Sequence, residues 1–111
     1  MLRIYPVILE FVAEVSPLVG RIARHDPDLA RQLRRACTSV ALNTAEAMYA
    51  RGRSKTASYG IALREMRESH AALEIAVRLG YVAPLAEELQ LRIRHVTGTL
   101  VRLSFPSRER I

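Results

Sequence analysis

The sequence predicts an all-α protein, an antiparallel up-down-up-down four-helix bundle. Apolar residues recur every three or four positions along four successive stretches, and no stretch alternates for long with the two-residue period of a strand. Ala, Leu, Arg and Glu dominate the composition, and these residues favour helices. Short connections between helices of about 20 residues make sequential neighbours antiparallel.

The first two helices are separated by a turn that contains proline. The first spans Ile4–Arg24, and Pro17 inside it predicts a kink near Ala13 because proline supplies no amide hydrogen. The second spans Pro27–Ala50, since Asp26 can cap its start and proline suits the first helical position. Its expected core stripe is Leu29, Leu33, Ala36, Val40, Asn43 and Ala47.

The third and fourth helices follow two further breaks. Gly52 can take the left-handed conformation after a helix, and Ser54 can cap a third helix that spans Lys55–Leu79. Pro84 opens the fourth helix, which reaches almost to Pro106.

The length of 111 residues allows one domain, with the bundle over residues 1–106 and a short charged tail over 107–111. No stretch of 18 apolar residues lacks charge, which excludes a membrane span. Glu10 and Glu14 interrupt the first apolar run, so no signal peptide is expected. The single Cys37 cannot form an internal disulfide, which fits a cytoplasmic location.

Small and apolar residues form a second stripe on the second helix. The stripe either packs against another copy of the chain or widens the face turned to the bundle core. It comprises Cys37, Ala41, Thr44 and Met48.

Catalytic and metal-binding signatures are absent from the sequence. The glycines are isolated, so there is no glycine-rich phosphate loop. A ferritin-like metal bundle needs Glu three residues before His, but Arg67 precedes His70 and Arg92 precedes His95 in this way. Cys37 has no partner for a metal site, and no carboxylates are arranged for two-metal chemistry. We therefore expect no enzymatic activity, no metal and no cofactor.

A polar cluster of Ser39, Asn43 and Glu46 recurs at one-turn spacing on the second helix. A buried Asn without hydrogen-bond partners costs a few kcal/mol, so partners are expected. The cluster either binds a ligand or forms a network that fixes helix register or a subunit contact, and we favour the structural interpretation.

The net positive charge lies in the middle third of the chain. Residues 31–67 hold eight basic and two acidic residues, a net charge of +6, whereas the remainder is balanced. Arginine recognises phosphate through two hydrogen bonds, although a GC-rich genome would give the same arginine bias. The candidate nucleic-acid contacts are Arg51, Arg53, Lys55, Arg34 and Arg35.

These five basic residues divide into two groups. Arg34 and Arg51 are separated by about 25 Å along a helix, so one small phosphate cannot touch both groups. The trio Arg51, Arg53 and Lys55 is the stronger candidate, because one of Arg34 and Arg35 can turn inward to Glu46 or Glu68. With few aromatic residues for base stacking, we do not expect selective binding of single strands.

An ordered set of short motifs spans nearly the whole chain. Its pieces are Gln32-Leu33-Arg34-Arg35-Ala36, Ser39-Val40, Asn43, Ala45-Glu46, the basic stretch 51–55, Ala62-Leu63 through Glu68, Ala76, and Arg78-Leu79-Gly80-Tyr81. Together they resemble the four-helix bundle proteins encoded in 23S ribosomal RNA intervening sequences. Two positions depart from that pattern: Ala47 stands where the family has Gly, and Arg64-Glu65 stands where it usually has Gly-Ser.

The resemblance implies a homopentameric, barrel-like assembly whose cellular role is largely unassigned. A similar fold is used by the accessory variability protein of diversity-generating retroelements, a basic pentamer that partners a reverse transcriptase and its nucleic acid. The leading hypothesis is a non-enzymatic oligomer that binds RNA or DNA alongside a nucleic-acid-processing partner. The alternative is a structural or protein-interaction scaffold, in which arginines pair with acids of other subunits.

Overall fold

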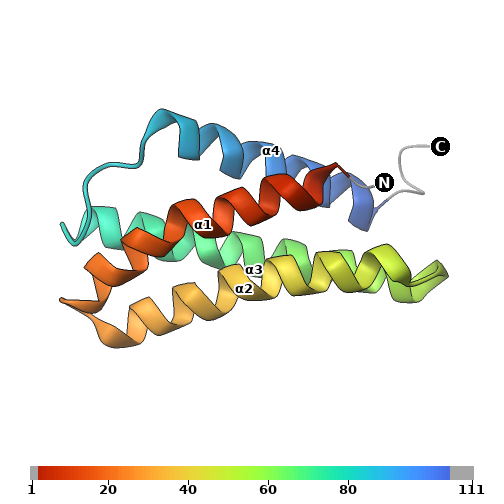
Figure 1. The fold of residues 1–111 in the computed structure, drawn as a ribbon, viewed down its shortest axis with the longest axis horizontal. Coiled ribbons are helices and arrows are strands. Elements are labelled where there is room, and N and C mark those ends of the chain that lie inside the picture. Colours follow the sequence, from red (N-terminus) through yellow and green to blue (C-terminus); the bar gives the residue numbers. More distant parts are fainter. Residues whose placement is uncertain (1–2, 106–111) are drawn as a thin grey trace.

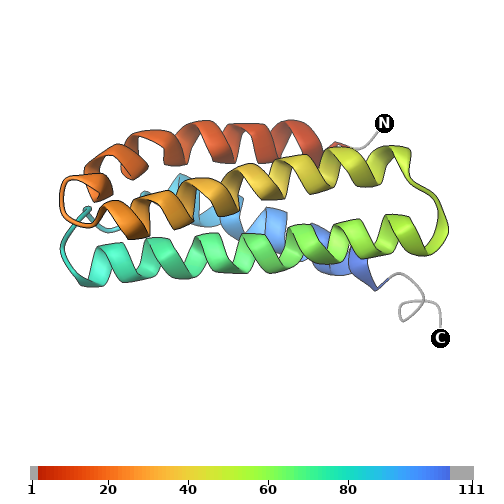
Figure 2. The ribbon, with the colours of Figure 1, turned by 90° about the horizontal axis from the view of Figure 1, so that it is seen from below.

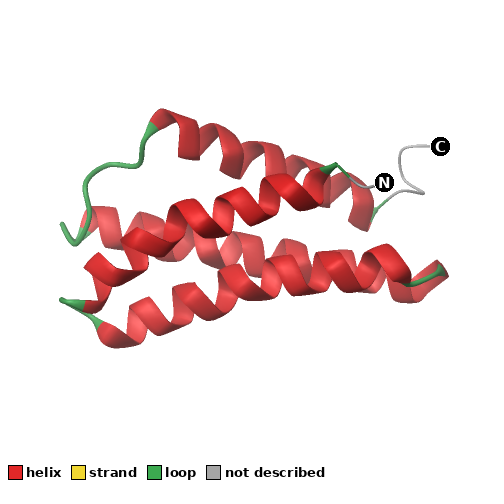
Figure 3. Ribbon diagram, viewed as in Figure 1, coloured by secondary structure: helices red, strands yellow, loops and turns green. Residues whose placement is uncertain are grey.

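The computed structural model describes residues 3–105 as an elongated bundle of 45 × 22 × 21 Å (Figure 1). Helices make up nearly all of this part, and no strand occurs in it (Figure 3). The helices are α1 (Ile4–Ala23), α2 (Pro27–Tyr49), α3 (Gly52–Arg78) and α4 (Glu87–Ser104). The tail predicted over 107–111 lies outside the described residues.

Each helix packs against two others, in the order α1–α2–α3–α4 and back to α1. Short turns join the first three helices, so α2 runs antiparallel to both α1 and α3, and α4 returns beside α1 (Figure 2). The all-α, up-down-up-down prediction is therefore confirmed. The turn between α2 and α3 lies at the opposite end of the bundle from the turns that follow α1 and α3 (Figures 1 and 2).

The core is a single apolar layer built from one stripe of each helix. Large side chains without solvent exposure fill its centre, and these are Phe11, Ile8, Ile22, Leu33, Met66, Leu73 and Leu100. Cys37 and Thr44 of α2 belong to this buried stripe, while Ala41 and Met48 are half-buried beside it. The second stripe of α2 thus largely widens the core face within one subunit.

Two of the predicted helix ends are confirmed, and α1 is not broken by its proline. The side chain of Asp26 accepts a hydrogen bond from the Leu29 amide at 3.0 Å, as expected of an N-cap before Pro27. Helix α1 continues through Pro17 as one helix of 20 residues, and the kink near Ala13 stays a prediction. At the end of α3, Gly80 has a φ of +79°, and the Tyr81 amide donates to the Ala76 carbonyl at 2.9 Å. This is a Schellman ending, which satisfies carbonyls of the last turn.

The predicted start of α3 is wrong by three residues. Gly52 adopts the expected left-handed conformation, with a φ of +58°, but it opens the helix. Arg51 is the N-cap residue and makes no side-chain capping bond, and Ser54 lies inside the first turn. The chain reverses through extended backbone at Ala50 and Arg51, so the helix can begin directly at the glycine.

The predicted start of α4 is also wrong by three residues, because Pro84 precedes the helix and Glu87 opens it. Val82 is 7% exposed and packs in the core together with the partly buried Leu85. The segment stays non-helical and crosses one end of the bundle as a loop (Figure 3). Glu87 and Glu88 then supply negative charge to the first turn, where the helix dipole favours it.

Two glycine substitutions should change stability in opposite directions. Gly80→Ala should lower the free energy of unfolding by about 1 kcal/mol, because a β-carbon disfavours the left-handed conformation. Gly20→Ala should raise it by about 1 kcal/mol, since Gly20 is an exposed helical residue with open space at its β-carbon position. Urea unfolding of both variants at one protein concentration measures the two effects. Equal shifts of the same sign would contradict the described ending of α3.

Candidate nucleic-acid interface

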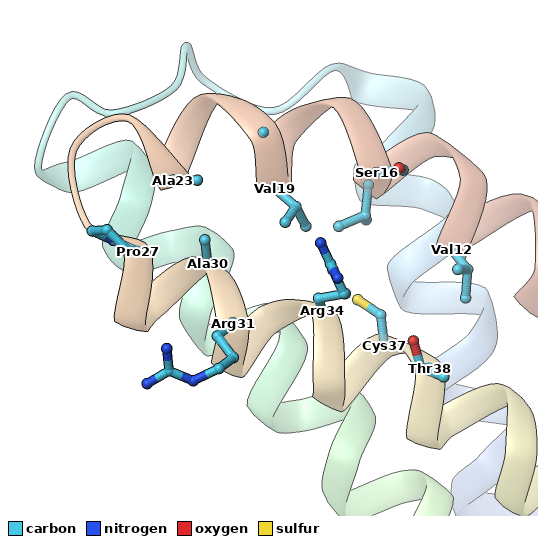
Figure 4. Close-up of a pocket in the computed structure, with 12 residues that line it drawn as sticks. Val12, Ser16, Val19, Ala23, Pro27, Ala30, Arg31, Arg34, Cys37 and Thr38 are labelled. Carbon is cyan, nitrogen blue, oxygen red and sulfur yellow. The ribbon is translucent and has the colours of Figure 1, made fainter.

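The structure places the five predicted basic residues at three separate locations. Arg51, Arg53 and Lys55 lie together at the junction of α2 and α3, and we call these three residues the basic turn. Arg35 lies between α2 and α3 and pairs with Glu68. Arg34 lies on the other side of α2, against α1 (Figure 4). Of the five predicted contact residues, only the three of the basic turn therefore lie close enough together to form one candidate site.

The basic turn presents three cationic side chains without acidic partners. Arg51 and Arg53 are exposed and Lys55 is half-buried, and none of these side chains forms a hydrogen bond or ion pair within residues 3–105. Thr56 donates a hydrogen bond to the Arg53 carbonyl at 3.1 Å, which ties down the first turn of α3. That first turn holds no acidic residue, so the positive end of the α3 dipole adds to the charge of the side chains.

Some arginines elsewhere in the bundle, among them Arg35 and Arg92, are neutralised by carboxylates. Arg92 has a side chain only 19% exposed; it hydrogen-bonds Glu14 and lies 3.5 Å from Glu10 and 3.9 Å from Glu88. These contacts stabilise the packing of α4 on α1. They also remove this guanidinium as a free contact for phosphate, in contrast to the basic turn.

Arg35 is neutralised in a similar way, on the surface between α2 and α3. Its guanidinium donates to Glu68 at 3.0 Å, so the predicted pairing of one helical arginine with Glu68 is confirmed. The prediction that this arginine is partly buried is wrong, because its side chain is 61% exposed. An exposed pair of this kind contributes little to stability.

Arg34 contributes to a groove between α1 and α2, far from the basic turn. The groove has a volume of about 590 Å³ and a largely apolar floor that includes Val15, Val19 and Cys37. The guanidinium of Arg34 extends over this floor toward α1 (Figure 4). Arg34 and Arg51 are about 25 Å apart along α2, so a single short ligand cannot bridge them.

The predicted polar cluster on α2 is smaller than expected. Asn43 donates to the backbone oxygen of Ser39 at 2.9 Å and to its hydroxyl at 3.0 Å, so the link between these two residues is confirmed. Glu46 is exposed and makes no hydrogen bond or ion pair with the described residues, so its place in the cluster is wrong. Asn43 is half-buried because Thr44, with no exposed surface, occupies the core position at this level.

The thiol of Cys37 is buried and hydrogen-bonded to another buried side chain. It is 3% exposed and donates to the Ser69 hydroxyl at 3.5 Å, and Ser69 in turn donates to the Glu65 carbonyl at 2.9 Å. Burial raises the pKa of the Cys37 thiol to about 11, and the Ser69 hydrogen bond offsets this only in part. The thiol is therefore protonated at neutral pH, which does not favour nucleophilic chemistry.

Two structural features are absent from residues 3–105. No three side chains of His, Cys, Asp or Glu gather where they could hold a metal ion. No described helix has both the length and the apolar character needed to cross a bilayer. His70 does lie near Glu74, at 3.7 Å, as the one-turn spacing of these two residues predicts.

A family model described as 23S rRNA-intervening sequence protein matches residues 1–102 of the chain. The chain belongs to this family. The fold of the family member is also found in a crystal structure of a protein of unknown function from the S23 ribosomal protein family of Bacteroides thetaiotaomicron. That structure shares 22% sequence identity at a TM-score of 0.78, over 92% of this chain and 98% of the other. No curated protein matches the chain.

These comparisons confirm the family resemblance and the bundle fold, and at 22% identity the crystal structure supports the fold alone. Neither comparison tests the expected similarity to the accessory protein of retroelements, which stays a prediction. The function proposed for this family member therefore rests on the charge and exposure of its own surface residues.

Sequence reasoning missed Tyr49, an aromatic residue next to the basic turn. Tyr49 is the last residue of α2, and its side chain is 87% exposed. The helical phase contained a signal: the core positions Leu33, Val40 and Ala47 place residue 49 on a different face of the helix from the core. The expectation that few aromatics are available for stacking did not take this position into account.

Asn43→Ala tests the structural role of the Ser39–Asn43 pair. Loss of the two half-buried hydrogen bonds should lower the free energy of unfolding by about 1 kcal/mol. Nucleic-acid affinity per folded subunit should stay unchanged, because Asn43 lies away from the basic turn. Unfolding and binding titrations measure the two effects on the same preparation. Normal stability with lost binding would instead make this pair part of a ligand site.

Proposed function

We propose that this member of the family is a non-enzymatic, oligomeric helical-bundle protein that binds nucleic acid through the basic turn. The observation that carries the proposal is the gathering of three cations within five residues at one turn of the bundle. Arg31, Arg35 and Arg92 have carboxylate partners, whereas the side chains of Arg51, Arg53 and Lys55 have none among the described residues. Three unpaired cations at one exposed end of the bundle suit a polyanion.

The chemistry of such a contact is electrostatic and independent of base sequence. Each phosphate neutralised by an arginine or lysine releases condensed counterions, so affinity falls steeply with salt. Arg51 and Arg53 can each donate two parallel hydrogen bonds to a phosphate, while Lys55 acts as a point charge. The turn lies at one end of the bundle, where Arg51 and Arg53 are exposed (Figure 2).

An oligomer would strengthen this binding. The family resemblance implies a homopentamer, and a ring of this kind would present several copies of the basic turn to one polyanion, which raises avidity without any new contact. Exposed apolar side chains on the outer faces of the bundle supply candidate subunit contacts. They include Leu9, Ile75 and Leu91, with exposed fractions of 46%, 47% and 53%.

A reverse transcriptase or other nucleic-acid enzyme as a partner rests on the resemblance to the retroelement accessory protein. The alternative function, a structural or protein-interaction scaffold, is favoured by the same exposed apolar side chains and by the α1–α2 groove. In that case the basic turn would pair with acids of a neighbouring subunit or partner. Nucleic-acid binding experiments separate the two functions.

Replacing Arg51, Arg53 and Lys55 together with Gln should weaken binding to duplex DNA and RNA. The slope of log affinity against log salt should fall by up to about three per bound subunit, since about three phosphate contacts are lost. The fold should persist because none of these side chains belongs to the buried core or forms a hydrogen bond or ion pair within residues 3–105. Fluorescence anisotropy at several salt concentrations provides the measurement.

A matched control removes the same charge at the opposite end of the bundle. The exposed Arg21, Arg24 and Arg78 lie there, and their replacement with Gln should leave the salt slope closer to that of the wild type. Equal losses in both triple variants would indicate a diffuse charge effect. An unchanged affinity and slope after replacement of the basic turn would favour the scaffold function.

Sedimentation equilibrium at micromolar concentration tests the assembly. We expect a mass close to five times the 12.5 kDa of one chain. Leu91→Glu, which places a charge on an exposed apolar position of α4, should lower that mass if the outer face of α4 forms a subunit contact. A wild-type protein that sediments as a 12.5 kDa monomer would contradict the oligomeric part of the proposal.

A further inference from the structure

Tyr49 has no evident role in folding. Among the large apolar side chains of the described residues it is the most exposed, at 87%, and its phenol makes no hydrogen bond or ring contact there. The other tyrosines differ, since Tyr59 is buried, Tyr5 is half-buried, and Tyr81 stacks on His25 at 4.9 Å between ring centres. An aromatic ring left in solvent gains free energy when a partner covers it.

Its surroundings indicate what kind of partner fits. Ala50 and Arg51 are extended, so the Cα atoms of Tyr49 and Arg51 are about 7 Å apart, and Arg53 and Lys55 follow in the first turn of α3. An open aromatic face thus adjoins three cations that lack carboxylate partners. Nucleic-acid proteins that hold single strands combine these two elements, a basic surface for the backbone and aromatic rings for the bases.

We infer that Tyr49 is a stacking platform for an unpaired base, which makes single-stranded nucleic acid the preferred ligand of the basic turn. This inference rests on the proposed function and narrows its substrate class. In a duplex the base faces are covered by their neighbours, so a duplex can use the three cations but not the ring. A single strand can use both, and it gains the stacking contribution in addition to the phosphate contacts.

Other residues on the outer face of α2 define the limits of this contact. Leu42 is 64% exposed and lies two helical turns before Tyr49, about 10 Å along the axis, where it can contact a further base or sugar. Glu46 is exposed between them and repels phosphate. The strand is therefore expected to place its phosphates toward the basic turn and its bases toward α2.

Tyr49→Leu separates stacking from charge, because it keeps an apolar side chain and alters no charge. Anisotropy titrations would use oligo(dT) and oligo(U) of about 20 nucleotides and a duplex of the same length. We expect about tenfold weaker binding of both single strands, less than about twofold change for the duplex, and an unaltered salt slope. Equal weakening of single strands and duplex, or no weakening at all, would overturn the inference.

The absence of tryptophan from the chain permits a direct spectroscopic test. Tyr49→Trp introduces a single indole that should retain affinity for oligo(dT) and lose fluorescence when a base stacks on it. Leu79→Trp places the same reporter on an exposed position at the opposite end of the bundle. Its emission should change little on saturation with oligo(dT). Similar quenching of the two reporters, or no quenching of Trp at position 49, would overturn the inference.

Separate results would overturn the proposed function and the stacking role of Tyr49. A wild-type protein that binds neither single strands nor duplex overturns the proposed function, and the inference with it. Wild-type binding that depends on Arg51, Arg53 and Lys55 but not on Tyr49 overturns the inference alone. Glu46→Gln gives a test of opposite sign, because removing this carboxylate should strengthen single-strand binding by a few-fold.

Discussion

The burial of four apolar stripes in one layer is the constraint on which the rest of the structure depends. A helix can turn only one face inward, so the core fixes the rotation of each helix about its axis. On α2 the core takes Leu33, Val40, Thr44 and Ala47, and this phase sends Leu42 and Tyr49 outward. The exposure of the candidate stacking residue is thus a consequence of core packing, since Tyr49 could not turn inward without displacing Ala47 or Thr44 from the interior.

Charge pairing follows from the same arrangement. Once α4 packs beside α1, Arg92 meets Glu10 and Glu14, which are distant in sequence, and its buried guanidinium is compensated. Between α2 and α3, Arg35 meets Glu68. At the turn between these helices no carboxylate of residues 3–105 pairs with Arg51, Arg53 or Lys55, so within this part of the chain their charge remains available to an external anion. The functional proposal therefore depends on where cations without a carboxylate partner gather, and three of them lie within five residues at this turn.

Some helix ends are determined by local residues, whereas others are determined by packing against the rest of the bundle or by the turn that follows. Asp26 and Gly80 act locally, through a side-chain cap and a left-handed residue, and both behave as their residue types indicate. Pro84 fails as a helix start because Val82 and Leu85 are needed against the core, and a non-helical segment places them there. Gly52 opens α3 earlier than expected because two extended residues are enough to reverse the chain. In the first case the conformation depends on contacts with the core, and in the second on the reversal of the chain between two helices. Neither can be predicted from the residues of the segment alone.

The sequence by itself determined the helical class, the up-and-down order, the cap at Asp26 and the family, because apolar period, turn residues and ordered motifs are local properties of the chain. It also identified the basic turn, since neighbours in sequence across a tight turn must be neighbours in space. Only the tertiary structure separated Arg34 from Arg35, moved Asn43 off the core stripe, excluded Glu46 from the polar cluster and exposed Tyr49 beside the cations. Adjacent residues on a helix point in directions that differ by about 100°. An error of one position in assigning the buried face therefore exchanges a buried residue for an exposed one. Only packing against the other helices fixes which face of each helix is buried.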